Sequence, residues 1–243
     1  MKQYTNQHEV AYFECDVNQM MTIPALLAVA LKISGEQSDQ LGVGEEVVHH
    51  LGLGWVITNY TLEITQMPRV GETVKITTQA TEYNKYFCYR TFWFRDQEGN
   101  DLVKIDSVFV LMDFEKRKMS SVRDEIVAPF ESEKIKKIKR QPKIEKIESG
   151  EMLPYRVRFY DIDSNQHVNN AIYFNWMIDV LGHEFLTNYT PTGVVVRFDK
   201  EVEYGKMIES HYEIVESAEG VQTRHEIKIG DQVYCEANIM WAN

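Results

Sequence analysis

The sequence contains one pattern twice, and this repeat is the feature that most restricts the possible folds. When the second copy is shifted back by 147 positions, Asp163 falls on Asp16 and Gln166 falls on Gln19. The copies read FECDVNQMMTIPALLAVALKISG at 13–35 and FYDIDSNQHVNNAIYFNWMIDVLG at 159–182. Each passes from a polar loop into an apolar run of helical length. Because these runs are apolar nearly all round, we expect two helices that are wrapped by other structure.

Both predicted helices are followed by segments rich in β-branched and aromatic residues, as β-strands are. They span 55–64, 72–80, 85–96 and 101–113 in the first half, and 193–205, 206–217, 220–230 and 232–242 in the second. Gly99-Asn100 and Gly230-Asp231 are typical of hairpin turns. The order of elements predicts an α+β double hotdog, in which two tandem antiparallel sheets each wrap a buried helix and pair as a pseudo-dimer. We expect an N-terminal repeat at 1–130, a charged linker at 131–151 and a C-terminal repeat at 152–243.

Composition excludes several classes of protein. A formal net charge of −11 argues against broad nucleic-acid binding, which needs a basic surface. The longest uncharged apolar stretch, 20–31, is too short to cross a bilayer, and no signal peptide is recognisable at the N-terminus. The three cysteines are widely spaced and odd in number. We therefore expect a cytoplasmic protein with reduced thiols, without a cofactor.

The predicted linker carries a strong local positive charge. Residues 134–146 contain seven Lys or Arg side chains and one Glu. A charge run of this kind is usually a solvated surface segment. The alternative is a docking patch for an acidic partner, because a local patch can steer association despite a negative net charge.

The two copies differ in their polar residues. His167 stands where the first copy has Met20, and Asn169 stands where it has Thr22. Thr22 suits the cap of a helix, and Asn169 could be an ordinary cap as well. Capping explains one or two polar residues, but not the whole string D-x-N-Q-H-V-N-N. We infer that the second copy kept a chemical role while the first kept a packing role.

The polar string has the components of an acyl-transfer site. Asp163, Asn165 and His167 alternate along the loop, so their side chains could point the same way. The amide groups at the start of the next helix, near 168–170, would form an oxyanion hole. His167 could act as a general acid or base. Glu203 is a candidate for the acid that positions or activates water.

The string DIDSNQHVNNAIYFNWM strongly resembles the signature of acyl-ACP thioesterases, which release fatty acids from acyl carrier protein. The resemblance extends over most of the chain, through FECDVN, PRVGETV and FDKEVEYG. It implies a double hotdog, hydrolysis of an acyl thioester, and a catalytic set at Asp163, Asn165, His167 and Glu203. Many plant members carry Cys directly after the family's Glu, where this chain has Tyr204. We therefore favour attack by water, while an anhydride with Glu203 stays open.

The resemblance also implies a partner and an apolar pocket. The partner is acylated acyl carrier protein, an acidic protein that could dock on 134–146. The acyl chain would lie under the first helix, with Met20, Met21 and Trp55 as wall residues and with Asn169 and Asn170 near the thioester.

Several alternatives stay open at this point. They are an acyl-CoA thioesterase of the same fold, a hotdog dehydratase and a non-catalytic acyl-binding protein. Both a monomer and a homodimer are compatible with the pattern. No metal site is predicted, since adjacent His49 and His50 point different ways and are expected in a surface loop.

Overall fold

The computed structural model describes residues 1–163, 166–218 and 220–243. Its strands are β1 (Gln3–Glu9), β2 (Leu53–Ile64), β3 (Thr73–Tyr83), β4 (Phe87–Arg95), β5 (Asp101–Asp113), β6 (Lys118–Ser120), β7 (Glu133–Lys134), β8 (Glu151–Arg156), β9 (Thr190–Phe198), β10 (Met207–Ser217), β11 (Gly220–Ile229) and β12 (Gln232–Ala242). Its helices are α1 (Ile23–Gln40), α2 (Glu45–His50), α3 (Asp124–Val127), α4 (Asn170–Asp179) and α5 (Gly182–Asn188), with 3-10 turns η1 (Tyr12–Glu14), η2 (Ala128–Phe130) and η3 (Phe159–Asp161).

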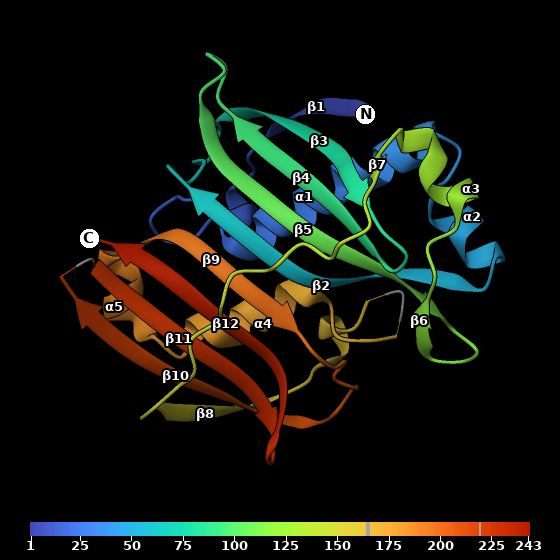
Figure 1. The fold of residues 1–243 in the computed structure, drawn as a ribbon. Helices are drawn as coiled ribbons and strands as arrows, with labels where there is room; N and C mark the ends of the chain where they lie inside the picture. The colour runs from blue at the N-terminus through green and yellow to red at the C-terminus, as the bar shows by residue number, and fades with distance from the viewer. Residues whose placement is uncertain (164–165, 219) are drawn as a thin grey trace.

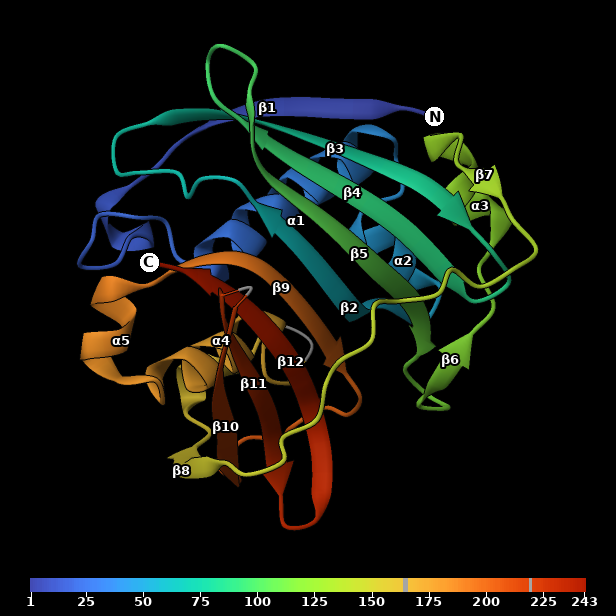
Figure 2. The ribbon, with the colours of Figure 1, turned by 60° about the vertical axis from the view of Figure 1, so that its left-hand side comes forward.

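One sheet runs through both halves of the molecule. Its strand order is β1-β3-β4-β5-β2-β9-β12-β11-β10-β8, with β6 beside β5 and β7 beside β3. The halves meet where β2 pairs antiparallel with β9, from Asn59 opposite Arg197 to Glu63 opposite Gly193. The first half curves around α1 and the second around α4 (Figures 1 and 2). The predicted double hotdog is confirmed.

The two central helices begin at side-chain caps. The Thr22 hydroxyl accepts the N–H of Ala25 at 3.3 Å, as the sequence predicted, and Pro24 lies in the first turn of α1. The Asn169 side chain accepts the N–H of Ala171 at 2.9 Å and so caps α4. Helix α1 continues to Gln40, well beyond its apolar run. The second half of α1 therefore contains small and polar residues, and it lies along the face of the sheet that curves around this helix.

One expectation about the outer parts of the chain changes. His49 and His50 end the short helix α2 rather than lying in a loop, and both are exposed. Among the described residues, no helix is long and apolar enough to span a bilayer.

The charged linker crosses the face of the sheet opposite to α1 and α4 (Figures 1 and 2). The backbone N–H of Glu145 donates to the Asn238 side chain at 2.7 Å. Lys146 pairs with the buried carboxylate of Glu236 at 2.7 Å, and Lys139 pairs with Glu82. The linker is thus bound along the sheet, and part of its positive charge is neutralised there.

His225 on β11 gives the fold a pH dependence. Its side chain is 1% exposed, contacts the Thr223 hydroxyl at 2.7 Å, and burial lowers its pKa to about 3. Because protonation then favours the unfolded chain, whose His has a pKa near 6.5, stability is complete above pH 6.5. It falls as the pH drops toward 3, by up to about 1.4 kcal/mol per pH unit.

We expect His225→Gln to flatten the decline in the free energy of unfolding between pH 6.5 and 4. Urea unfolding at several pH values, with the exposed His183→Gln as the matched control, measures this slope. Equal slopes in wild type and His225→Gln would contradict the assignment.

Candidate active site

The loops before α1 and α4 have the same backbone structure. The N–H of Asp16 donates to the carbonyl of Met20, and the N–H of Asp163 donates to that of His167, each at 2.9 Å. Gln19 and Gln166 both have a positive φ, 61° and 68°. At the described positions, which leave out 164–165, the repeat seen in the sequence is therefore also a repeat of backbone conformation.

His167 faces a carboxylate in the second loop. Its Nε2 lies 2.9 Å from Oε2 of Glu201, and the two side chains are 30% and 40% exposed. An ionised carboxylate only accepts hydrogen bonds, so Nε2 carries the proton in this pair. Glu201 follows the end of β9, and His167 precedes α4 by three residues. Their meeting depends on the fold, since 33 intervening residues form α4, α5 and β9.

A hydrogen bond that both loops form shows which residue of the first half corresponds to Glu201. Met21 N–H donates to the carbonyl of Pro68 at 2.8 Å, and the equivalent Val168 N–H donates to that of Val202 at 3.3 Å. The residue before each acceptor is Met67 in the first half and Glu201 in the second. Met67 is 4% exposed. The pair His167 and Glu201 thus corresponds to two methionines, Met20 and Met67, in the first half.

Glu203, the acid expected from the sequence, lies elsewhere. Its side chain is 66% exposed, it is 3.8 Å from Lys206, and it does not line the cavity beside His167. The segment after β9 is irregular and turns at Gly205, where φ is 78°. This turn directs Glu203 away from the loop, so the structure brings Glu201 and not Glu203 to His167.

Fewer backbone amide groups are available for the predicted oxyanion hole than the sequence suggested. Val168 N–H donates to Val202, and Asn169 N–H donates to the carbonyl of Asp161 at 2.9 Å. Both amides are therefore engaged within the fold. The first N–H of α4, that of Asn170, has no acceptor inside the helix and carries the positive end of the helix dipole. It is the amide best suited to a developing oxyanion.

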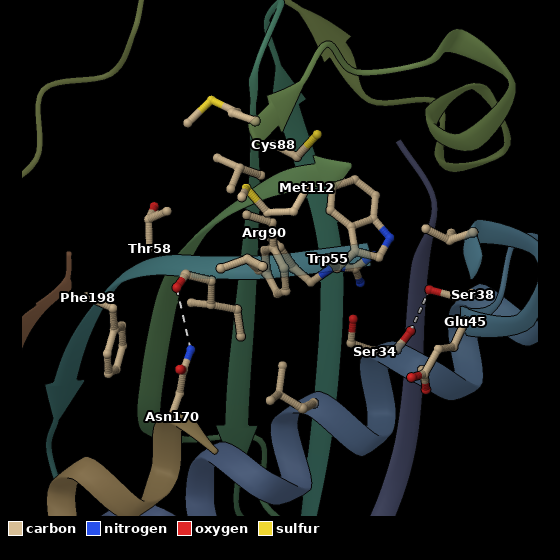
Figure 3. Close-up of a pocket in the computed structure, with 18 of the residues that line it drawn as sticks. Ser34, Ser38, Glu45, Trp55, Thr58, Cys88, Arg90, Met112, Asn170 and Phe198 are labelled. Atoms are coloured by element: carbon tan, nitrogen blue, oxygen red, sulfur yellow. Dashed lines mark hydrogen bonds between the residues drawn. The ribbon is translucent and has the colours of Figure 1, made fainter. Parts of the chain in front are cut away.

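A cavity of about 920 Å³ begins beside His167 and Glu201. It extends between the second half of α1 and strands β2 to β5, and it also touches α2 and η2. Its walls include the apolar side chains of Leu31, Trp55 and Phe109. Figure 3 shows Trp55 on one side of it and Asn170 on the other, with the Asn170 side chain donating to the Ile57 carbonyl at 3.4 Å. The volume suits a small-molecule ligand.

Some of the other predicted site residues line the cavity, and others do not. Asp163, Asn169, Asn170 and Trp55 line the cavity. Met20 and Met21 do not. Met21 is fully buried in the core. Asn165 lies outside the described residues.

Burial makes the cysteines poor nucleophiles. It raises the pKa of the Cys88 thiol, which lines the cavity, to about 12. It also raises the pKa values of Cys15 and Cys235. A thiol rather than a thiolate is present at neutral pH, so these side chains are not activated for attack.

The arrangement joins an acid–base pair, an unpaired helix amide and a mainly apolar cavity. Such a site can activate water against a carbonyl whose apolar substituent lies in the cavity. Sequence reasoning named Glu203 in the segment DKEVEYG, whereas the structure places Glu201 of that segment beside His167. The repeat does not separate the two glutamates, because TQMPRVG in the first half has Met67 where Glu201 stands and Arg69 where Glu203 stands.

Comparison with known proteins gives one consistent family. A family model described as the acyl-ACP thioesterase N-terminal domain matches residues 1–130, and one described as the C-terminal domain matches 144–243. The chloroplastic acyl-[acyl-carrier-protein] hydrolase FATB3 of Cuphea viscosissima is 24% identical over 232 residues, which cover 89% of this chain and 56% of that protein. The oleoyl-acyl carrier protein thioesterase of Coriandrum sativum is 21% identical, covering 85% and 61%. The chain spans a little over half the length of these relatives.

Solved structures agree with this assignment. A putative oleoyl thioesterase from Lactobacillus plantarum is 41% identical, with a TM-score of 0.95, covering 100% of this chain and 96% of that chain. The 12:0-ACP thioesterase from Umbellularia californica has a TM-score of 0.85 at 18% identity, covering 99% and 97%, and shows the shared fold.

Proposed function

The chain belongs to the acyl-ACP thioesterase family, and from this premise we propose that it hydrolyses the thioester of fatty acyl-acyl carrier protein and releases a free fatty acid. The observation that carries the proposal is the pairing of His167 with Glu201 on the wall of a large, mainly apolar cavity. A cytoplasmic location is part of the proposal, because all three cysteines are unpaired. Both a monomer and a homodimer fit it.

In the proposed mechanism, Glu201 takes the role that the sequence gave to Glu203. Its carboxylate accepts a proton from water while the water oxygen attacks the thioester carbonyl. His167 holds the carboxylate through the Nε2–H bond, and the N–H of Asn170 stabilises the oxyanion. The carbon–sulfur bond then breaks, and the thiolate takes the proton from Glu201. Attack by Glu201 itself, through an anhydride, would use the same residues.

Two polar residues of the loop complete the proposal. Asp163 lines the cavity next to the pair and would orient the loop and His167. Asn165 stays a member of the catalytic set that the D-x-N-x-H pattern predicts, and would help to orient the acid that activates water.

The acyl chain would occupy the cavity beside the second half of α1. Trp55 and Phe109 form a T-shaped pair with centroids 6.2 Å apart, and both line the cavity. Burying a chain of methylene groups against such a wall is favourable by about 0.8 kcal/mol per CH₂. The acyl chain would therefore enter the cavity past Asn170, with the thioester carbonyl at the start of α4.

The carrier protein would approach from the cavity side of the sheet. Arg117 and Lys200 line the cavity and offer positive charge there. The linker lies against the opposite face, where Lys139 and Lys146 are already paired. An acidic carrier that docks near Arg117 and Lys200 can insert its acyl chain without crossing the sheet.

The decisive experiment for the chemistry compares two carboxylates in one segment. We expect Glu201→Gln to lower kcat on acyl-ACP by about 10² or more, because it removes the base. Glu203→Gln should stay within about threefold of wild type, since its side chain points to solvent. Release of free fatty acid under saturating substrate measures both. The reverse ranking would restore Glu203 as the acid, and loss of activity in neither would refute the site.

A second experiment tests the carrier. We expect Arg117→Glu with Lys200→Glu to raise KM for acyl-ACP roughly tenfold and to change hydrolysis of a short acyl-CoA much less. Reversing Lys136 and Lys137 in the linker should leave both substrates nearly unchanged. Faster wild-type hydrolysis of acyl-CoA than of acyl-ACP would favour the alternative, a CoA thioesterase of the same fold. Tight acyl binding without hydrolysis of either substrate would favour a non-catalytic acyl-binding protein.

Gly35 offers a test of where the acyl chain lies. It lines the cavity in the middle of α1, and a Cβ placed on it would meet no atom within 4 Å. Gly35→Leu should fill part of the cavity and shift the preference toward shorter chains. Gly35→Ala is the matched control, which leaves most of the space and stabilises the helix by about 1 kcal/mol. An unchanged profile of kcat/KM against chain length in Gly35→Leu would place the chain elsewhere.

A further inference from the structure

The cavity contains a buried cation that the proposed mechanism does not use. Arg90 on β4 lines the cavity and is 7% exposed. Its Nη1 donates to the side-chain oxygen of Gln37 at 2.6 Å and to the Thr78 hydroxyl at 3.0 Å. The guanidinium lies 5.0 Å from the centre of the Phe130 ring. All of these partners are uncharged.

Arg90 has unused donors. Among the described residues it forms no ion pair, and its Nε and Nη2 groups, which are not sealed within the core, bond no protein acceptor there. A buried charge without a counter-ion is costly, and a cavity that serves only a hydrocarbon chain gains nothing from one. The cost is reduced if a ligand supplies the missing acceptor.

The surroundings of Arg90 are polar as well. Ser34 and Ser38 of α1 line the cavity, and the Ser38 hydroxyl donates to the Ser34 carbonyl at 2.9 Å. Figure 3 places Arg90 between Cys88 and Trp55, away from Asn170. Strand β4 is separated from β2 by β5, and strands are spaced by about 4.8 Å. Arg90 is therefore on the order of 10 Å from Ile57, which contacts Asn170 beside the reacting carbonyl.

We propose that Arg90 forms a polar subsite that binds an oxygen substituent, a hydroxyl or an oxo group, on the middle or distal part of the acyl chain. The chain would pass the aromatic wall at Trp55 and Phe109 and present its oxygen to Nε and Nη2 of Arg90. This inference rests on the proposed function for the identity of the ligand as an acyl chain. It adds that oxygenated chains are preferred over plain chains of equal length.

The test measures binding, so that it does not depend on turnover. The ligands are acyl-pantetheine amides, which cannot be hydrolysed and have no free carboxylate to pair with Arg90. One chain length is used, either unsubstituted or with a single hydroxyl at a series of positions. Calorimetry gives Kd for wild type, Arg90→Met, Arg90→Lys and the control Thr58→Val, which changes a cavity-lining hydroxyl on β2.

We expect wild type to bind at least one hydroxylated chain about tenfold more tightly than the plain chain, as a hydrogen bond to a charged group allows. Arg90→Met should bind the plain chain as well as wild type does and lose the preference. Arg90→Lys should keep part of it, and Thr58→Val should keep all of it. Retained binding of the plain chain shows that each variant is folded.

Two results would overturn the subsite. One is a wild-type protein without preference at any hydroxyl position, and the other is a preference that survives in Arg90→Met. Failure of the proposed function has a different signature. In that case hydroxylated chains bind in an Arg90-dependent way, while acyl-ACP and acyl-CoA are not hydrolysed.

Discussion

The pairing of β2 with β9 is the contact on which the rest of the structure depends. Along this seam the two half-sheets become one, with Thr61 opposite Val195 at its centre. The seam brings the start of α4, in the second half, against β2 of the first half, where Asn170 reaches the carbonyl of Ile57. The acid–base pair comes from one half and most of the cavity from the other. Neither half alone would contain both.

The repeat explains why the proposed active site lies in the second half. Both loops keep the same hydrogen bonds and the same positive φ, so the backbone is needed for starting a helix at the seam. In the first loop, Met20 and Met67 replace the histidine and the carboxylate. Methionine adapts to irregular spaces and needs no hydrogen-bond partner. The first half could therefore lose its chemistry without losing its packing.

Charge is placed differently on the two faces of the sheet. On the outer face, Glu236 is 1% exposed but is paired with Lys146 and with Arg197 at 2.8 Å, so the linker is held against the second half of the sheet. On the inner face, burial lowers the pKa of the Arg90 guanidinium to about 10, which leaves it charged at neutral pH. The outer charges are paired within the chain, whereas Nε and Nη2 of Arg90 are the donors that we propose for a ligand.

The sequence by itself determined the features that depend on local order and periodicity. The repeat, the capping of α1 by Thr22, the hairpin at Gly230 and the polar loop around His167 all follow from residues close together in the chain. The carboxylate that pairs with His167 did not follow from local order. Glu201 and Glu203 flank the buried Val202, and no periodic rule applies in an irregular segment that turns at Gly205. Only the tertiary structure decided between them, because it fixes which side chain meets a histidine 34 positions earlier.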